Sequence, residues 1–171
     1  MSTALESADT APLALARRLG ELTGIVGALP AAIFTARGPG GVSGSIGEHV
    51  RHCLDHVSAW IGARSGHTLT YDARHRGTTV ETDTIRAVQE LAAHVFALEQ
   101  WRGSLDEPIQ VSSLLAPGGR PCISWSTMGR ELAFVISHTV HHQAVIAVLL
   151  AMQDVAVPER FGYAASTPSR H

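Results

Sequence analysis

Apolar side chains recur at intervals of three or four residues in several segments of the chain, which is the spacing of one face of a helix. The first segment, between Pro12 and Pro30, carries the stripe Leu15, Leu19, Leu22, Val26 and Leu29. A later segment, with cap candidates at 82–84, carries the stripe Ile85, Val88, Leu91, Val95 and Leu98. These patterns predict two helices, one from Pro12 to Pro30 and one starting near residue 84.

Another helix is predicted by its start and stop signals. Ser45 and Glu48 have the spacing of a capping box, in which each side chain bonds the backbone N–H of the other residue. This helix is expected to run from Ile46 to about Arg64, with Gly66 as its stop signal. The preceding stretch RGPGGVSGS, residues 37–45, is too rich in glycine for regular structure.

The last predicted helix, from about Ser126 to about Met152, is the most apolar segment and carries only Arg130 and Glu131 as charged residues. It is long enough to span a bilayer. However, its first half holds polar side chains that would be costly in lipid: Ser137, His138, Thr139, His141, His142 and Gln143. We therefore expect the central helix of a soluble bundle and no membrane partner.

Two short segments alternate apolar and polar residues. IQVSS (109–113) and CISWS (122–126) flank the turn sequence APGGRP and predict a short β-hairpin before the last helix. Four helices with connections of up to about twenty residues indicate an all-α fold, a four-helix bundle with a long crossover connection. The 171 residues suit one domain, with residues 1–10 as a loose N-terminal tail and residues 155–171 as a C-terminal extension.

Composition and charge narrow the class of protein. The net charge is −2 and no run of Lys or Arg exceeds two residues, so nucleic acid is not expected as a partner. The N-terminus lacks a positive segment followed by an apolar one, which predicts a cytoplasmic protein. The two cysteines, Cys53 and Cys122, form no C-x-x-C motif and are interpreted as reduced, small core residues.

Histidines carry the candidate chemistry. Six of the ten lie in two predicted helices: His49, His52, His56, His138, His141 and His142. At about 100° per residue, His138 and His142 share one helix face, as do His52 and His56. If the two helices are neighbours, two histidines from one and one from the other form a three-nitrogen face that binds Zn, Ni or Fe and leaves positions open. The predicted ligands are His52, His138 and His142.

The remaining histidines allow several roles. His49 and His56 share the face of His52, so each is a candidate replacement ligand, proton shuttle or partner that orients a ligand. We expect one of the two to be catalytic. His141 points about 100° away from His142 and is expected to be structural. The alternative to a metal site is a set of core or subunit-contact histidines, each hydrogen-bonded to a carbonyl or hydroxyl group.

These motifs resemble the DinB-like superfamily, small four-helix proteins that include thiol-dependent transferases and isomerases. The resemblance rests on SIGEHVRHCLDH (45–56), YDARHRGTTVETD (71–83), GRELAFVISHTVHHQAVI (129–146) and FGYAAST (161–167). By position, it implies that His52 and the pair His138 and His142 are ligands of a divalent metal ion, zinc or nickel first and iron or manganese as alternatives. It also implies a homodimer. The sequence departs from the common Arg-Gly-Gln after the double histidine, since it has Gln143, Ala144 and Val145.

The leading hypothesis is a divalent-metal-dependent enzyme that acts on a small molecule. The resemblance favours a transferase or isomerase that uses a low-molecular-weight thiol as cosubstrate, with His49 or His56 moving the proton. A metal-dependent hydrolase is the alternative reaction. A non-catalytic stress protein that binds a metal or ligand is the alternative from another class, and its site would be closed by a fourth protein ligand. A helical dimerisation module would need no metal.

Overall fold

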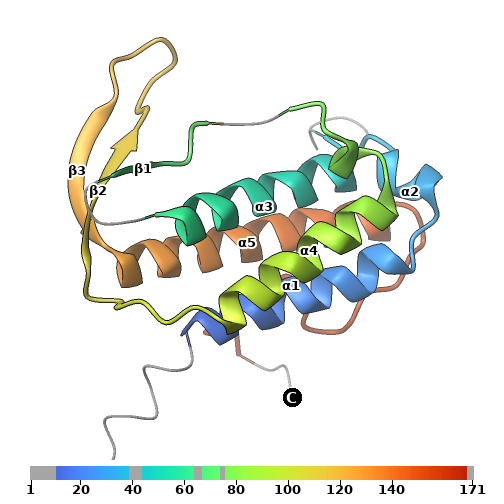
Figure 1. Cartoon of the computed structure of the whole chain (residues 1–171). Coiled ribbons are helices and arrows are strands. Elements are labelled where there is room, and N and C mark those ends of the chain that lie inside the picture. The colour runs from blue at the N-terminus through green and yellow to red at the C-terminus, as the bar shows by residue number, and fades with distance from the viewer. Residues whose placement is uncertain (1–10, 39–43, 64–66, 74–75, 169–171) are drawn as a thin grey trace, which may run out of the picture.

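Figure 1 shows the computed structural model, which describes residues 11–38, 44–63, 67–73 and 76–168. The expected loose tail, residues 1–10, and the expected stop signal Gly66 lie outside the described residues. The elements are, in order, α1 (Ala11–Gly27), α2 (Ala31–Thr35), α3 (Ile46–Gly62), β1 (Thr68–Thr70), the 3-10 helix η2 (Thr79–Glu81), α4 (Thr84–Glu99), β2 (Pro108–Ser113), β3 (Cys122–Thr127) and α5 (Met128–Ala151). The protein is therefore mainly helical, with a small three-stranded sheet.

The helix starts follow the local sequence. The predicted capping box is present on α3, where the Glu48 N–H donates to Ser45 Oγ at 3.2 Å and the Ser45 N–H donates to Glu48 Oε2 at 2.7 Å. Asp83 lies within the predicted cap region of α4, and its carboxylate accepts from the N–H groups of Ile85 and Arg86. These caps satisfy N–H groups that have no partner within the helix. They set where α3 and α4 begin.

Four long helices lie side by side, with α1 packed most closely on α4 and α3 packed on α5 (Figure 1). The stripe predicted for α1 is buried throughout, from Leu15 to Leu29. The stripe predicted for α4 is only partly correct, because Leu91 and Leu98 are buried whereas Ile85 is 69% exposed. Ile85 lies in the first turn of α4, before the helix is covered by its neighbours.

The predicted hairpin is confirmed and gains a third strand. β2 and β3 pair antiparallel, with Val111 opposite Ser124, and β1 pairs parallel to β2, with Leu69 opposite Val111. Leu69, Ile109 and Val111 are buried where the sheet meets the helices. In Figure 1 the sheet lies at the end of the helices where α3 ends and α5 begins. The parallel strand was not predicted, because its partner is about forty residues away along the chain.

The two cysteines lie in different surroundings. Cys53 is fully buried, and burial raises the pKa of its thiol to about 12, so it is an unreactive core residue as predicted. Cys122 is exposed, and the prediction of a core position was wrong. Trp125 is also 72% exposed. Both lie on β3, an edge strand whose outer face no element of the described chain covers.

α5 meets the length and composition of a membrane-spanning helix, yet it is partly buried within this globular fold, which is consistent with a soluble protein. One of its buried polar side chains bonds a neighbouring helix. The Gln143 amide donates to the Arg18 carbonyl of α1 at 2.8 Å, so the residue that departs from the family pattern ties α5 to α1. In the C-terminal extension, Phe161 is buried and Gly162 lies against the backbone of Ala144, where a Cβ atom would come within 2.6 Å.

Candidate metal centre

The packing of α3 on α5 brings three histidines from two distant parts of the chain together. His138 Nε2 lies 3.0 Å from His52 Nε2 and 3.2 Å from His142 Nε2. The ligand atoms of all three lie within 4.8 Å of one another. His138 and His142 are one turn apart on α5, so both rings reach the same point beside α3. The two helices expected to be neighbours are therefore neighbours, and the three predicted ligands lie together.

This donor set fits a divalent ion. Bonds of about 2.0–2.1 Å to one ion place two nitrogens about 2.9 Å apart at right angles and about 3.4 Å apart in a tetrahedron. The observed separations of 3.0 and 3.2 Å fall between these limits. A neutral imidazole nitrogen has either one proton or one lone pair, so His138 Nε2 cannot form good hydrogen bonds to both neighbours at once. A shared cation satisfies all three nitrogens.

The electrostatics of the cluster keep His142 unprotonated. Burial, and after it the neighbouring rings of His138, His52, His49 and His141, together lower the pKa of His142 to about 2. Metal binding requires a neutral imidazole, because a protonated ring has no lone pair to donate. At neutral pH His142 therefore does not need to release a proton before it can coordinate.

His49 contacts the second nitrogen of His142. The two Nδ1 atoms are 3.0 Å apart. If His142 Nε2 is a ligand, its proton is on Nδ1 and donates to His49 Nδ1, which fixes the tautomer and orientation of the His142 ring. The proton of a neutral His49 is then on Nε2, at the ring edge away from His142. His49 therefore supports the site from outside the group of three.

His56 supports the site through stacking. It is buried, and its Nδ1–H donates to the backbone carbonyl of His52 at 3.1 Å. Its ring stacks on His138, with centroids 4.0 Å apart, and on Tyr71, with centroids 5.0 Å apart. His56 is not among the nitrogens that converge in the group of three. It braces two of the three histidines, one through the backbone and the other through its ring.

Comparison with known proteins places the chain in a family. Residues 14–146 match the sequence model of the DinB superfamily, and this range contains all six clustered histidines. The chain belongs to the DinB superfamily. A DinB relationship was expected from the motifs and is confirmed. The chain is also 32% identical over 101 residues to FK506-binding protein 5 of Rhizopus delemar, which covers 58% of this chain and 26% of that protein. The chain thus spans about a quarter of that relative, and no solved structure matches.

In this DinB protein a cavity of about 550 Å³ opens beside the three histidines. Its lining includes two of them, His52 and His142, together with His49, and it does not include His56. The other lining residues are Arg37, Gly44, Glu48, Arg51, Arg76, Gly77 and Glu81. Of the two candidate catalytic histidines, only His49 therefore borders this space.

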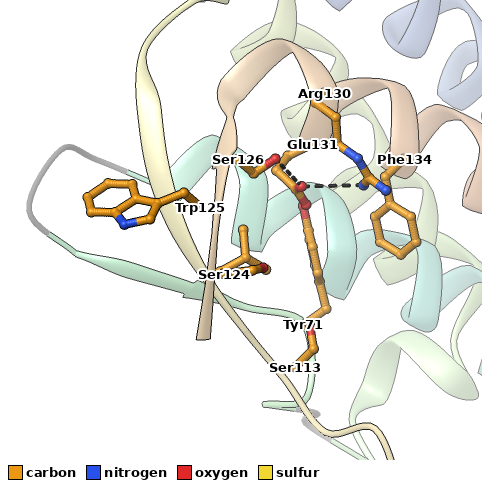
Figure 2. A pocket seen from close by; sticks show the side chains of 9 residues that line it. Tyr71, Ser113, Ser124, Trp125, Ser126, Arg130, Glu131 and Phe134 are labelled. Atoms are coloured by element: carbon orange, nitrogen blue, oxygen red, sulfur yellow. Dashed lines mark hydrogen bonds and ion pairs between the residues drawn. The ribbon is translucent and has the colours of Figure 1, made fainter. Parts of the chain in front are cut away.

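The ring of His56 that stacks on His138 also stacks on Tyr71. Tyr71 and Glu131 in turn connect the helices to the sheet (Figure 2). The Tyr71 hydroxyl donates to Glu131 Oε2 at 3.1 Å, and Glu131 Oε1 accepts from Ser126 at 2.7 Å and from Arg130 at 3.3 Å. Burial and the adjacent Glu131 carboxylate raise the pKa of Tyr71, which therefore stays protonated. These residues border a second cavity of about 380 Å³ under the hairpin.

The sequence predicts the grouping of the three histidines but not the position of Tyr71. The motif around Tyr71 was noted, yet nothing in the spacing places a loop residue against a helix sixty positions later. The buried Glu131 pairs with Arg130. Asp55 pairs with Arg51, and both side chains are largely buried. His141 is exposed, with its ring 5.0 Å from that of His142.

Proposed function

We propose that this DinB-superfamily protein is a divalent-metal-dependent enzyme whose ion is held by His52, His138 and His142. The observation that carries the proposal is the convergence of three Nε2 atoms, separated by 3.0 and 3.2 Å, from two packed helices. Three imidazole donors suit zinc or nickel first, and iron or manganese as alternatives. The same arrangement supports the four-helix bundle as the frame of the site.

The cavity favours catalysis over storage. Among the described residues, no fourth His, Cys, Asp or Glu joins the group of three, and open space borders His52 and His142. A structural metal site is closed by four protein ligands, whereas a catalytic one keeps a position for water or substrate. A non-catalytic metal-binding or ligand-binding stress protein is therefore the second candidate.

When bound, a divalent ion lowers the pKa of a coordinated water or thiol and so supplies a nucleophile. The residues of the chain hold the ligand rings in position and transfer protons to and from the substrate. His49 fixes the His142 ring through the contact between their Nδ1 atoms and can donate the proton on its Nε2 to a substrate in the cavity. His56, packed between His138 and Tyr71, holds the ligand face rigid.

For the reaction, we propose thiol-dependent transfer or isomerisation of a small molecule, with a low-molecular-weight thiol as cosubstrate. Support comes from the resemblance to the transferases and isomerases of the DinB superfamily. Hydrolysis by metal-bound water uses the same residues and is the alternative reaction. The homodimer and the cytoplasmic location, with no nucleic-acid or membrane partner, are part of the same proposal and rest on the resemblance and on the charge pattern of the sequence.

Elemental analysis of protein purified without chelators tests the metal site. We expect about one ion per chain in the parent protein and almost none in His52→Ala and His138→Ala. His94→Ala is the matched control, because His94 lies on α4 and bonds Ser58 and the Glu90 carbonyl instead of the cluster. A folded parent that takes up no zinc or nickel would contradict the proposal. Product formation from an electrophile, compared with and without added thiol, separates transfer from hydrolysis.

A further inference from the structure

The cavity beside the three histidines carries an unequal set of charges. Three arginines and two glutamates line it: Arg37, Arg51, Arg76, Glu48 and Glu81. Any bound divalent ion would add to the positive side. The charge that a ligand meets depends on which of these side chains are already neutralised by one another.

Both glutamates are engaged by groups of the protein. Glu48 pairs with Arg37 and accepts the Ser45 N–H in the capping box. Glu81 lies 2.6 Å from Arg51 Nε and accepts the Gly77 N–H at 3.0 Å. Each carboxylate is therefore engaged by an arginine and by a backbone N–H group of the protein.

Arg51 is more than neutralised, because one guanidinium faces two carboxylates. Its guanidinium pairs with Glu81 and also with Asp55, and the side chains of Arg51 and Glu81 are only 10% and 13% exposed. This buried network holds η2 against α3. Arg51 therefore shapes the wall of the cavity and is not the group that meets a ligand's charge.

Arg76 is different. It is exposed and borders the cavity, and within the described ranges it has no ion pair. The next residue, Gly77, has φ +73°, and its N–H is bonded to Glu81, which anchors the turn that carries Arg76. An anchored backbone places a flexible cation at the edge of the cavity.

We propose that this cavity selects small anionic substrates bearing a carboxylate, and that Arg76 is the specificity-determining residue that recognises the negative charge. The inference rests on the proposed function in taking the cavity as the entrance to the metal site. A guanidinium presents a planar fork of donors that matches a carboxylate. The volume of about 550 Å³ suits a small molecule.

Calorimetric titration with succinate, on protein loaded with zinc and on metal-free protein, tests the proposal. Succinamide, which has the same shape without charge, is the ligand control. Arg76→Gln is expected to weaken succinate binding about tenfold or more, since a hydrogen bond to a charged group is lost. Arg120→Gln is the matched protein control, because Arg120 is equally exposed but lies in the loop between β2 and β3. It is expected to change the affinity less than about twofold.

The outcomes separate this proposal from the metal site. Equal binding of succinate and succinamide overturns the proposed anion selectivity, and so does unchanged succinate binding in Arg76→Gln. The metal content of the same samples is a separate measurement and decides the metal site in either case. Succinate binding that depends on Arg76 in protein that takes up no metal supports anion recognition and contradicts the enzyme proposal. Succinate bound only through the ion would show no loss in Arg76→Gln, and this too overturns the proposal.

Discussion

Each histidine has two ring nitrogens, Nδ1 and Nε2, and the partners of these two atoms differ from one histidine of the cluster to the next. His142 presents Nε2 to His138 and Nδ1 to His49. His56 uses Nδ1 on a backbone carbonyl and its ring face on His138. The same side chain is thus a proposed ligand at one position and a support at another. The contact made by the second nitrogen is what separates these roles.

His49→Ala is expected to weaken metal binding roughly 10- to 100-fold without unfolding the protein, because His142 loses the partner that orients its ring. The measurement is a zinc titration in competition with a chromophoric chelator. His141→Ala is the control, since His141 is exposed and its ring centroid lies 5.0 Å from that of His142, against 5.1 Å for His49. An affinity in His49→Ala equal to that of the control would show that His49 does not position His142.

The stability of the metal-free protein should fall as the pH falls below about 6.5. The pKa of His142 is about 2 in the folded protein against 6.5 for an unperturbed histidine, so between these values the unfolded chain binds a proton that the folded protein does not. Acid therefore favours unfolding. Urea denaturation at pH 7.5 and 5.5 with chelator present measures the effect, and His142→Gln should show a smaller loss. An equal loss in the variant would assign the pH dependence to other groups.

At the scale of elements, the short helix η2 closes one side of the cavity by lying directly on α3. Gly47 of α3 makes this contact possible, because a Cβ atom there would lie 2.1 Å from the Glu81 carbonyl oxygen. The close approach brings Glu81 within reach of Arg51. The close contact between Gly47 and the backbone of η2 thus determines the position of the charged side chains that line this part of the cavity.

Gly47→Ala should destabilise the protein by at least about 2 kcal/mol, because the added methyl group pushes η2 away from α3. Gly20→Ala is the matched control. Gly20 is an exposed glycine inside α1 with nothing within 4 Å of its Cβ position, so alanine should stabilise the protein by about 0.5–1 kcal/mol. Chemical denaturation of both variants measures the two changes. Equal effects would mean that helix propensity, not the contact with η2, decides the outcome at Gly47.

The sequence predicts the long helices and the histidine pairs within α3 and within α5, because both depend on short spacings. The Ser45 capping box and the spacing of His138 and His142 each lie within one or two helical turns. What could not be predicted depends on contacts between distant segments. The pairing of β1 with β2, the position of Tyr71 on His56 and the exposure of Ile85 all follow from how the elements pack, which no local pattern encodes.

At the scale of the molecule, contacts between side chains connect the three-histidine cluster to the sheet. The sheet holds Ser126 and Thr127 at the start of α5, and the first turn of α5 carries Glu131. Through Glu131, Tyr71 and His56 a continuous line of contacts reaches His138. The sheet therefore fixes the end of the helix that carries two of the three proposed ligands.

Metal loading should raise the melting temperature of the whole protein. An ion at about 100 times its dissociation constant stabilises the folded state by about 2.7 kcal/mol, which corresponds to roughly 5–10 °C for a chain of this size. Thermal melts with excess zinc and with chelator measure the difference. His52→Ala should show almost no difference between the two conditions. The same rise in His52→Ala would place the stabilising ion elsewhere on the protein.

The separation of His52 and His138 by 86 positions in the sequence also orders events during synthesis of the protein. The ribosome releases α3 long before α5, so the growing chain presents His52 without His138 or His142. One imidazole binds a divalent ion weakly, and the cavity that orients it does not yet exist. Acquisition of the proposed ion would therefore follow emergence of α5, and this ion would have no part in guiding the earlier helices as they fold.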